Sequence, residues 1–410
     1  MTQQVLIIGY VWLEKTTGAG NRMFQLIELF LKNGYKITFA SPAQKTKNSL
    51  DLILLNIDEV AIELNSSSFD DFIKELQPNL VVFDRFMMEE QFGWRVAENC
   101  PQAIRILDTE DLHSLRKTRQ DKLKKGLDFK VDNLLASDIT KREIASILRC
   151  DVSLIISSFE MDLLKNLFKV DESLLLHLPF LLNKIDDKQT KNWLPFEDRE
   201  HFVFVGNFLH APNVDAVLQL KLIWKLIRKQ LPKIEVHIYG AYATQQINQL
   251  QNEKEGFIVK GFVENIEEVI RKAKVVIAPL QFGAGIKGKL TEAMICGTPS
   301  ITTSIGSEGM HYDFPWNGVV EDNYNEFAAK AVELYSNKTL WVNSQKNGIE
   351  IINKLYDKER LGKTFIKRIE STQQNLTEHR KQNFLGSLLQ HQTLQATKYM
   401  SKWIEEKNKS

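Results

Sequence analysis

Glycine and proline are both scarce in this chain, which has 20 glycines and 10 prolines among its 410 residues. Proteins usually contain about 7% glycine and about 5% proline, so collagen-like, low-complexity and linker-dominated chains are excluded. Where glycine does occur we expect a backbone reason for it, because glycine loses more conformational entropy on folding than any other residue.

Cysteine and charge of one sign are also in short supply. Cys100, Cys150 and Cys296 form neither a CxxC pair nor a Cys/His metal spacing, and an odd count suits a reducing compartment better than a disulfide framework. The 53 Lys and Arg residues balance 52 Asp and Glu residues, which leaves a formal charge of +1. Nucleic-acid binders usually carry a basic excess, so we expect no nucleic-acid partner.

Long hydrophobic runs are missing as well. The apolar run near the N-terminus has the length of a strand, lacks a preceding basic segment and ends at Gly9, which does not fit a secretory signal. No stretch of the sequence reaches the ~18 apolar residues that a membrane-spanning helix needs. We therefore expect a cytoplasmic protein that touches a membrane peripherally at most.

Strand and helix patterns alternate along the chain in two series. The first series predicts strands at 5–8, 35–40, 80–83, 104–107 and 152–156, and the second predicts strands at 202–205, 235–239, 257–260, 275–279 and 300–303. Strands that are apolar on both faces indicate parallel sheets covered by helices. The predicted fold is α/β, with two Rossmann-like doubly wound domains facing across a cleft in which ligands bind.

The domain boundaries follow from composition. We expect an N-terminal domain over 1–183, a polar linker over 184–199, a second domain over 200–355 and a helical tail over 356–410. The tail repeats apolar residues at helical spacing, namely Phe384, Leu385, Leu388, Leu389, Tyr399, Met400, Trp403 and Ile404. We expect this stripe to pack on the body of the protein, with a partner or membrane contact as the alternative.

Six of the 20 glycines fall within residues 283–309, directly after the predicted strand 275–279. A flexible loop that leads into a helix near Gly288 presents backbone N–H groups and the positive end of the helix dipole, which suits a phosphate. Lys287 and Lys289 add charge there, and Glu292 can accept two hydrogen bonds from a ribose. The pattern predicts a diphosphate site, and the alternative is a tight turn with solvated lysines.

Four stretches of the chain resemble group 1 (family 4) glycosyltransferases. The glycine window carries Lys-x-Lys-x-x-Glu-Ala-Met-x-x-Gly-x-Pro over 287–299 and Gly-x-Glu-Gly over 306–309. Residues 204–216 are similar to the opening of that family's second domain, residues 261–279 match the approach to the window, and Gly18-Ala-Gly20 resembles a small loop of the first domain. Gly285-Ile-Lys287-Gly-Lys289 is similar to a branch with a Gly-x-Lys-x-Lys donor loop.

The resemblance implies the two-domain GT-B fold and transfer of a sugar from a nucleotide diphosphate donor, with retention and without a bound metal or other cofactor. The acceptor, whether glycan, lipid or another molecule, is not indicated. Glu292 would hold the donor ribose, and the amides of residues 285–288 would hold the sugar and diphosphate. The donor-binding residues implied are Gly18, Gly20, Gly206, Asn207, His210, Asn213, Gly285, Ile286, Lys287, Gly288, Lys289 and Glu292.

The chain departs from the family at two positions. The family often has two glutamates separated by seven residues, but the position eight before Glu292 is Ala284. The basic pair that often follows the first strand of the second domain is also absent, with Asn207, His210 and Asn213 nearby instead. We expect Lys287 and Lys289 to supply the missing charge, while His210 is either a phosphate contact or a polar residue at a helix start.

An acidic segment follows the predicted strand 104–107. Asp108, Glu110, Asp111 and His113 lie within six residues, so neighbouring charges can shift their pKa values. In the resembled family a loop here contacts the transferred sugar, and we select Asp111, His113 and then Asp108 as catalytic candidates. A capped helix start is the alternative.

Two further polar segments have alternatives of their own. Asp84 and Arg85 follow another strand and either line the acceptor side or form a structural ion pair. The basic run over 116–125 is expected to be a solvated helix face, with an anionic surface as the alternative.

The leading hypothesis is a cytoplasmic glycosyltransferase that uses a nucleotide-sugar donor to build a polysaccharide, glycolipid or other glycoconjugate. One rival is a catalytically silent GT-B subunit that binds nucleotide or glycan, which Ala284 motivates. Another is a different GT-B enzyme, such as a sugar-nucleotide epimerase.

Overall fold

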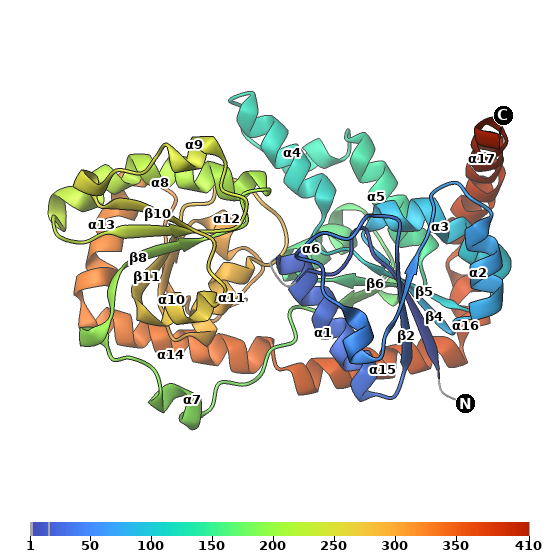
Figure 1. Ribbon diagram of the computed structural model, residues 1–410, viewed down its shortest axis with the longest axis horizontal. Coiled ribbons are helices and arrows are strands. Elements are labelled where there is room, and N and C mark those ends of the chain that lie inside the picture. The colour runs from blue at the N-terminus through green and yellow to red at the C-terminus, as the bar shows by residue number, and fades with distance from the viewer. Residues whose placement is uncertain (1–2, 15–16, 410) are drawn as a thin grey trace. The chain divides into compact units, whose positions relative to one another are not determined.

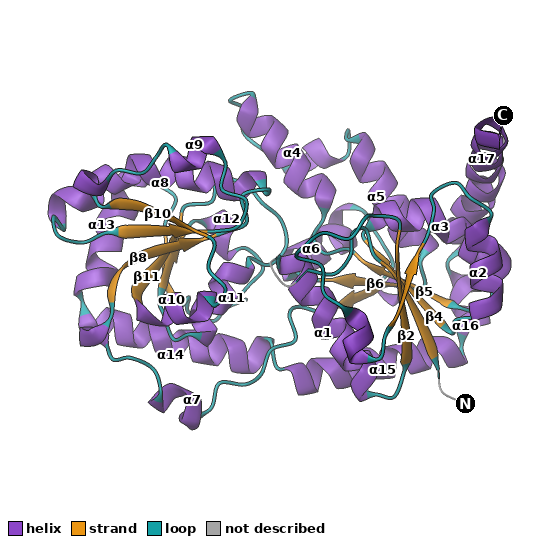
Figure 2. Ribbon diagram, in the orientation of Figure 1, coloured by secondary structure: helices purple, strands orange, loops and turns teal. Residues whose placement is uncertain are grey.

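The computed structural model describes residues 3–14 and 17–409, which divide into two α/β units. The first unit comprises Met1–Thr118, Phe129–Leu181 and Arg360–Ser410, and the second comprises Arg119–Asp128 and Leu182–Glu359. The segment 119–128 therefore belongs with the second unit, and the chain returns to the first unit after Glu359. Both units have helices on the two faces of one sheet (Figure 2).

The first unit is built on a seven-stranded parallel sheet with the order β3-β2-β1-β4-β5-β6-β7. Its strands are β1 (Gln4–Ile8), β2 (Lys36–Ser41), β3 (Asp58–Ala61), β4 (Leu80–Asp84), β5 (Ile104–Asp108), β6 (Val152–Ile155) and β7 (Leu175–His177). Strands β2, β4, β5 and β6 of this sheet are labelled in Figure 1. The sequence predicted every strand of the sheet except β3 and β7. Those two lie at the edges of the sheet, and both are short and only partly buried.

Helices cover both faces of this sheet. They are α1 (Gly18–Lys32), α2 (Ser68–Leu76), α3 (Phe86–Asn99), α5 (Asp138–Arg149) and α6 (Ser158–Asp162). Helix α4 (His113–Lys124) begins in this unit and runs into the segment that belongs with the second unit. On one face, α1 and the C-terminal helix α15 (Lys358–Gln374) bury a common core, in which the Phe30 and Phe365 ring centroids lie 5.4 Å apart. Elsewhere α3 contacts β4 and β5 and packs against α5.

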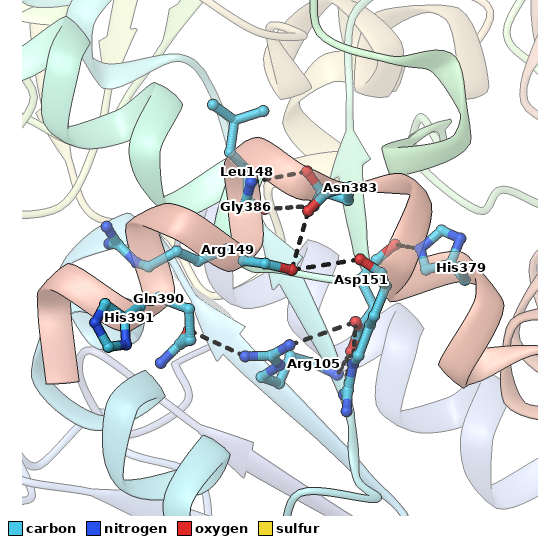
Figure 3. Close-up of a pocket in the computed structure, with 11 residues that line it drawn as sticks. Arg105, Leu148, Arg149, Asp151, His379, Asn383, Gly386, Gln390 and His391 are labelled. Carbon is cyan, nitrogen blue, oxygen red and sulfur yellow. Dashed lines mark hydrogen bonds and ion pairs between the residues drawn. The ribbon is translucent and has the colours of Figure 1, made fainter.

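The last two helices, α16 (Leu376–Gln382) and α17 (Phe384–Lys409), are attached to the rest of the first unit by an ion pair between the partly buried Arg380 and the buried Asp151. The Arg380 guanidinium donates to both carboxylate oxygens of Asp151, at 2.7 and 2.8 Å, and also to the carbonyl of Ala103. His379 contacts the Asp151 carbonyl, and Arg105 reaches Gln390 on α17 (Figure 3). Arg105, Asp151, His379, Arg380 and Gln390 are among the residues that line a pocket of about 240 Å³.

The apolar stripe of the tail does not pack as expected. Phe384, Leu385, Leu388, Tyr399, Met400 and Trp403 are all exposed on α17, and only Leu389 and Ile404 of the eight are partly buried. The expectation was wrong because α17 touches α3 and α5 through other residues, such as the buried Ser401 and Gly386.

The second unit is built on a six-stranded parallel sheet with the order β10-β9-β8-β11-β12-β13. Its strands are β8 (Glu200–Val205), β9 (Val236–Tyr239), β10 (Phe257–Gly261), β11 (Ala273–Ala278), β12 (Ser300–Thr302) and β13 (Gly318–Val320). Its helices are α7 (Asp187–Lys191), α8 (Ala211–Gln230), α9 (Gln245–Asn248), α10 (Ile266–Lys272), α11 (Gly288–Ile295), α12 (Ser304–Ser307), α13 (Tyr324–Ser336) and α14 (Lys338–Leu355). The prediction of two Rossmann-like parallel-sheet domains is confirmed.

Replacing Arg380 with alanine tests how the tail is attached. Asp151 is only 2% exposed, so Arg380→Ala leaves a buried carboxylate without its bidentate partner. We expect the free energy of unfolding to fall by about 3 kcal/mol in urea denaturation. Lys381→Ala is the matched control, because its ion pair with Glu378 is exposed and should contribute less than ~1 kcal/mol. Equal losses for the two variants would contradict this attachment.

Candidate functional site

The glycine-rich loop of the second unit joins the carboxyl end of β11 to the amino end of α11. Gly285 has φ = 64°, a left-handed conformation that glycine adopts without strain. Lys287 is the N-cap residue of α11, and its side chain makes no capping hydrogen bond to the helix. Its ammonium instead donates to the Gly285 carbonyl at 2.8 Å. The glycine-rich loop is therefore followed by a helix that begins at Gly288, as the sequence predicted, and Lys287 lies at the junction.

Lys289 lies on the first turn of α11 and points to the first turn of α8. Its ammonium donates to Oδ1 of Asn213 at 2.5 Å, and Nδ2 of Asn213 donates to the Asn207 carbonyl at 2.8 Å. The ammonium also lies 4.9 Å from the centroid of the Phe204 ring. Three predicted donor-site residues, Lys289, Asn213 and Asn207, are thus joined in one network.

Burial and neighbouring charge shift the two ionisable groups of α11. Burial, with a smaller contribution from Lys287, lowers the pKa of Lys289 to about 8, although Glu292 opposes the shift. Burial raises the pKa of Glu292, and Lys289 opposes that rise. The start of α11 therefore holds a buried ammonium beside a buried carboxylate, and burial disfavours the charged form of both.

Gly206 and Gly240 leave room for close packing at the carboxyl ends of β8 and β9. A Cβ atom at Gly206 would lie 2.7 Å from Cγ of Asn213, and one at Gly240 would lie 1.9 Å from the Gly206 carbonyl oxygen. Any side chain at Gly206 would displace Asn213, which is the hydrogen-bond partner of Lys289. His210 is the N-cap residue of α8, and its side chain makes no capping hydrogen bond.

Arg119 contacts the glycine-rich loop at Gly283. This residue was not selected from the sequence. Its guanidinium donates to the Gly283 carbonyl at 2.9 Å and to both oxygens of Glu308, at 2.7 and 2.8 Å. Arg119 is 6% exposed, so the expectation of a solvated basic face over 116–125 is wrong at this residue. Sequence reasoning missed Arg119 because nothing in a run of basic residues indicates which of them is buried.

In the first unit, acidic residues gather at the carboxyl ends of β4 and β5, where Asp84 and Asp108 are register partners. Asp108 is fully buried and accepts from Nε of Arg22 at 2.8 Å, while burial raises its pKa against the effect of that guanidinium. Asp84 accepts from the Tyr10 amide at 3.0 Å and lies 3.3 Å from Nε of Arg85. The ion-pair alternative for Asp84 and Arg85 is therefore present.

Asp111 and His113 lie close together, as the sequence predicted, but the carboxylate of Asp111 also forms an ion pair with a third residue, Arg116. Burial would raise the pKa of Asp111, yet Arg116 at 2.8 Å and the nearby His113 outweigh it and hold that pKa well below its usual range. Nε2 of His113 is 3.4 Å from Oδ1 of Asp111. Burial lowers the pKa of His113 to about 4 although Asp111 opposes the shift, so the imidazole is neutral at pH 7.

Glu110 is the strongest candidate for proton transfer and was not selected from the sequence. Burial raises its pKa well above the ordinary value, and the carboxylates of Asp108 and Asp84 raise it further. Its backbone has φ = 62°, which is uncommon outside glycine, and its Oε1 is buried without a hydrogen-bond partner among the described residues. Sequence spacing showed the acidic cluster but not that burial raises the pKa of this member so strongly.

The start of α4 is capped by distant residues rather than by Asp108 or Asp111. Glu143 on α5 accepts from the amides of His113 and Ser114, at 2.9 and 3.0 Å, and burial raises its pKa to about 7. The local cap that the sequence offered as an alternative is therefore wrong.

Gly18 and Gly20 form the first turn of α1. A Cβ at Gly20 would lie 1.7 Å from the Glu14 carbonyl oxygen, and the Gly20 amide donates to the side chain of Thr17 at 2.9 Å. Gly20 therefore has a packing reason of its own. Around Gly18, no described atom lies within 4 Å of such a Cβ, so Gly18 is the open position.

Residues 199–337 match the family described as Glycosyl transferases group 1. This range contains β8 through α13, including the glycine loop with Lys287, Lys289 and Glu292. The match thus falls within the second unit. No curated protein sequence matches the chain.

Solved structures extend the likeness to both units. A sucrose-phosphate synthase from Thermosynechococcus elongatus aligns with a TM-score of 0.65 at 16% identity, over 90% of this chain and 98% of that one. HepE from Anabaena in complex with UDP and glucose aligns with a TM-score of 0.61 at 13% identity, over 90% and 99%. A mutant of TarM from S. aureus, in complex with fondaparinux, alpha-GlcNAc-glycerol and UDP, aligns with a TM-score of 0.55 at 16% identity over 73% of this chain, which spans 58% of that protein. The chain has the GT-B fold.

Acid titration tests the buried environment of His113. Because the folded pKa of about 4 lies below the ordinary value of 6.5, the unfolded chain binds a proton first, and stability falls as pH drops through this window. Acid lowers the free energy of unfolding, which urea denaturation at several pH values measures. We expect His113→Gln to make this decrease smaller by up to about 3 kcal/mol. His391→Gln, at an exposed site on α17, should leave the pH profile unchanged. An unchanged profile for His113→Gln would contradict the burial effect.

Proposed function

We propose that this protein is a glycosyltransferase that transfers a sugar, with retention, from a nucleotide diphosphate donor to a glycan, lipid or other acceptor. The observation that carries the proposal is the junction of β11 and α11, where a left-handed glycine, a helix start and two lysines converge. This junction lies within residues 199–337, which match the Glycosyl transferases group 1 family, and this supports the proposal. HepE and the TarM mutant, which share the fold, were each solved with UDP.

The donor diphosphate would bind at the amino end of α11. Backbone amides of residues 285–288 and the helix dipole would face its oxygens, with the ammonium groups of Lys287 and Lys289 beside them. A diphosphate gains charge as it leaves the sugar, so these fixed donors would stabilise the transition state more than the ground state. Two lysines at this point make a bound metal unnecessary for charge neutralisation.

Glu292 would orient the nucleoside by accepting hydrogen bonds from the ribose hydroxyls. It lies one turn into α11 beyond Lys289, and each of the two residues affects the pKa of the other. Asn207 and Asn213 would hold Lys289 in place before the donor arrives.

The acidic edge of the first unit would serve the sugar and the acceptor. Asp111 is a poor proton acceptor because Arg116 keeps it ionised, whereas the neutral His113 can donate or accept a hydrogen bond. Glu110, whose pKa is raised by burial and by the neighbouring carboxylates, would exchange a proton with the substrate. Retention within one face of the donor requires no enzyme nucleophile, and we assign none.

Nucleotide binding tests the donor site. We expect Lys289→Met to weaken UDP binding by about 10- to 100-fold in calorimetry at pH 7, which is the loss of one charge-assisted hydrogen bond of ~1.5–3 kcal/mol. Since the pKa of Lys289 is about 8, wild-type affinity should fall as pH rises from 7 to 9, and the variant should lack that fall. Lys254→Met, at an exposed site, is the control. GDP and ADP are tested in parallel because the base is not indicated.

Turnover distinguishes an enzyme from a silent nucleotide-binding subunit. UDP-, GDP- and ADP-sugars are incubated with the chain and acceptor extracts, and released nucleotide is measured. We expect release by the wild type and a loss of at least about 100-fold in kcat for Glu110→Gln. If the wild type binds nucleotide but releases none from any donor, the proposed sugar transfer is refuted. If Glu110→Gln releases nucleotide as fast as the wild type, only the role of Glu110 is refuted and the proposed transfer stands.

We also propose that α17 places the protein peripherally on an anionic membrane at the cytoplasmic face. Phe384, Leu385 and Leu388 are exposed near one end of the helix, and Trp403 near the other lies 5.3 Å from the ammonium of Lys407. Exposed aromatic and apolar residues with flanking lysines suit a lipid interface. No helix among the described residues is both long and apolar enough to cross a membrane.

Vesicle sedimentation tests this contact. We expect the wild type to bind phosphatidylglycerol-containing vesicles better than phosphatidylcholine vesicles, and Phe384→Ser/Leu385→Ser/Leu388→Ser to lose most of that binding. Ile53→Ser/Leu54→Ser removes two equally exposed apolar side chains elsewhere and is the control. Equal sedimentation of the wild type and the α17 variant would contradict the contact.

A further inference from the structure

Three metal-ligating side chains lie together at the amino end of the second sheet. His201 belongs to β8, His237 belongs to β9, and Glu235 immediately precedes β9. The two strands pair in parallel with Phe202 opposite Val236, and alternate residues of a strand face the same side, so Glu235 and His237 share a face. One ligand atom of each of the three residues lies within 4.8 Å of the other two.

The ligand atoms of this cluster are close and accessible. Nε2 of His237 lies 2.7 Å from Oε2 of Glu235, and the ring centroids of His201 and His237 are 4.8 Å apart. Nε2 of His201 lies 3.9 Å from the carboxylate of Glu200, whose side chain is largely exposed. The three side chains are between 19% and 37% exposed, so an ion can reach them from solvent.

We propose that His201, Glu235 and His237 bind a first-row divalent cation of the Zn²⁺ class. Two imidazoles and one carboxylate are ligands that Zn²⁺ favours, and Glu200 or a water molecule would complete a tetrahedral set. The ion would replace the proton shared by His237 and Glu235. The cluster lies at the opposite ends of the strands from the glycine loop, so the ion takes no part in the proposed sugar transfer.

Two features of the cluster limit its affinity. Nδ1 of His201 accepts the Glu235 amide at 3.2 Å, but a neutral ring that coordinates through Nε2 carries its proton on Nδ1, so binding must break this hydrogen bond. The ammonium of Lys260 also acts on both Glu235 and His237, and its charge opposes a cation. We therefore expect weaker binding than in a closed structural zinc site.

Zinc titration of the whole chain tests the proposal. The protein is used without an affinity tag, treated with a chelator, and titrated with ZnCl₂ in a calorimeter. We expect one saturable site in the wild type, and a dissociation constant at least about tenfold higher for His201→Ala and for His237→Ala, which is ~1.4 kcal/mol. His391→Ala removes an exposed imidazole on α17 and should bind like the wild type. MgCl₂, a hard cation that prefers oxygen ligands, should not compete.

Thermal unfolding separates lost binding from lost folding. Metal-free His201→Ala, His237→Ala and Glu235→Gln should each keep a cooperative transition, and ZnCl₂ should raise the Tm of the wild type but not of these variants. The proposal is overturned if the wild type shows no saturable zinc binding. It is also overturned if the histidine variants bind zinc as tightly as the wild type.

Discussion

The parallel pairing of β8 with β11 is the constraint on which the second unit depends. Since both strands run the same way, the segments that follow them emerge at one edge of the sheet, and the lack of a side chain at Gly206 leaves room for Asn213. Lys289 on the first turn of α11 can then donate to Asn213 on the first turn of α8. The cation is held at a helix start before any anion arrives, which is the preorganisation that diphosphate binding needs.

Much of this arrangement could be predicted from the sequence, because it follows from chain order. A buried β-branched run, a glycine-rich loop and a helix with Lys289 and Glu292 on its first turns specify a strand, a turn and a helix start without any distant contact. The two sheets followed from the same periodicity. Edge strands such as β3 and β13 did not, because they are short and only half-buried.

The residues that sequence reasoning missed depend on burial and on distant partners. Arg119 looks like one of several surface cations in its segment, and only folding places it on Gly283 and Glu308. Glu110 is one of three neighbouring acids, and only burial beside Asp108 and Asp84 raises its pKa. The exposed stripe of α17 was misjudged because periodicity identifies an apolar face without saying what covers it.

A crystal structure of the chain with UDP is the most direct test of the central claim, that the junction of β11 and α11 holds a diphosphate. The account predicts that the diphosphate lies at the amino end of α11, within hydrogen-bond distance of the amides of residues 285–288 and of Lys289, with Glu292 on the ribose. Density for UDP at any other place, with the start of α11 empty at saturating nucleotide, would contradict the account.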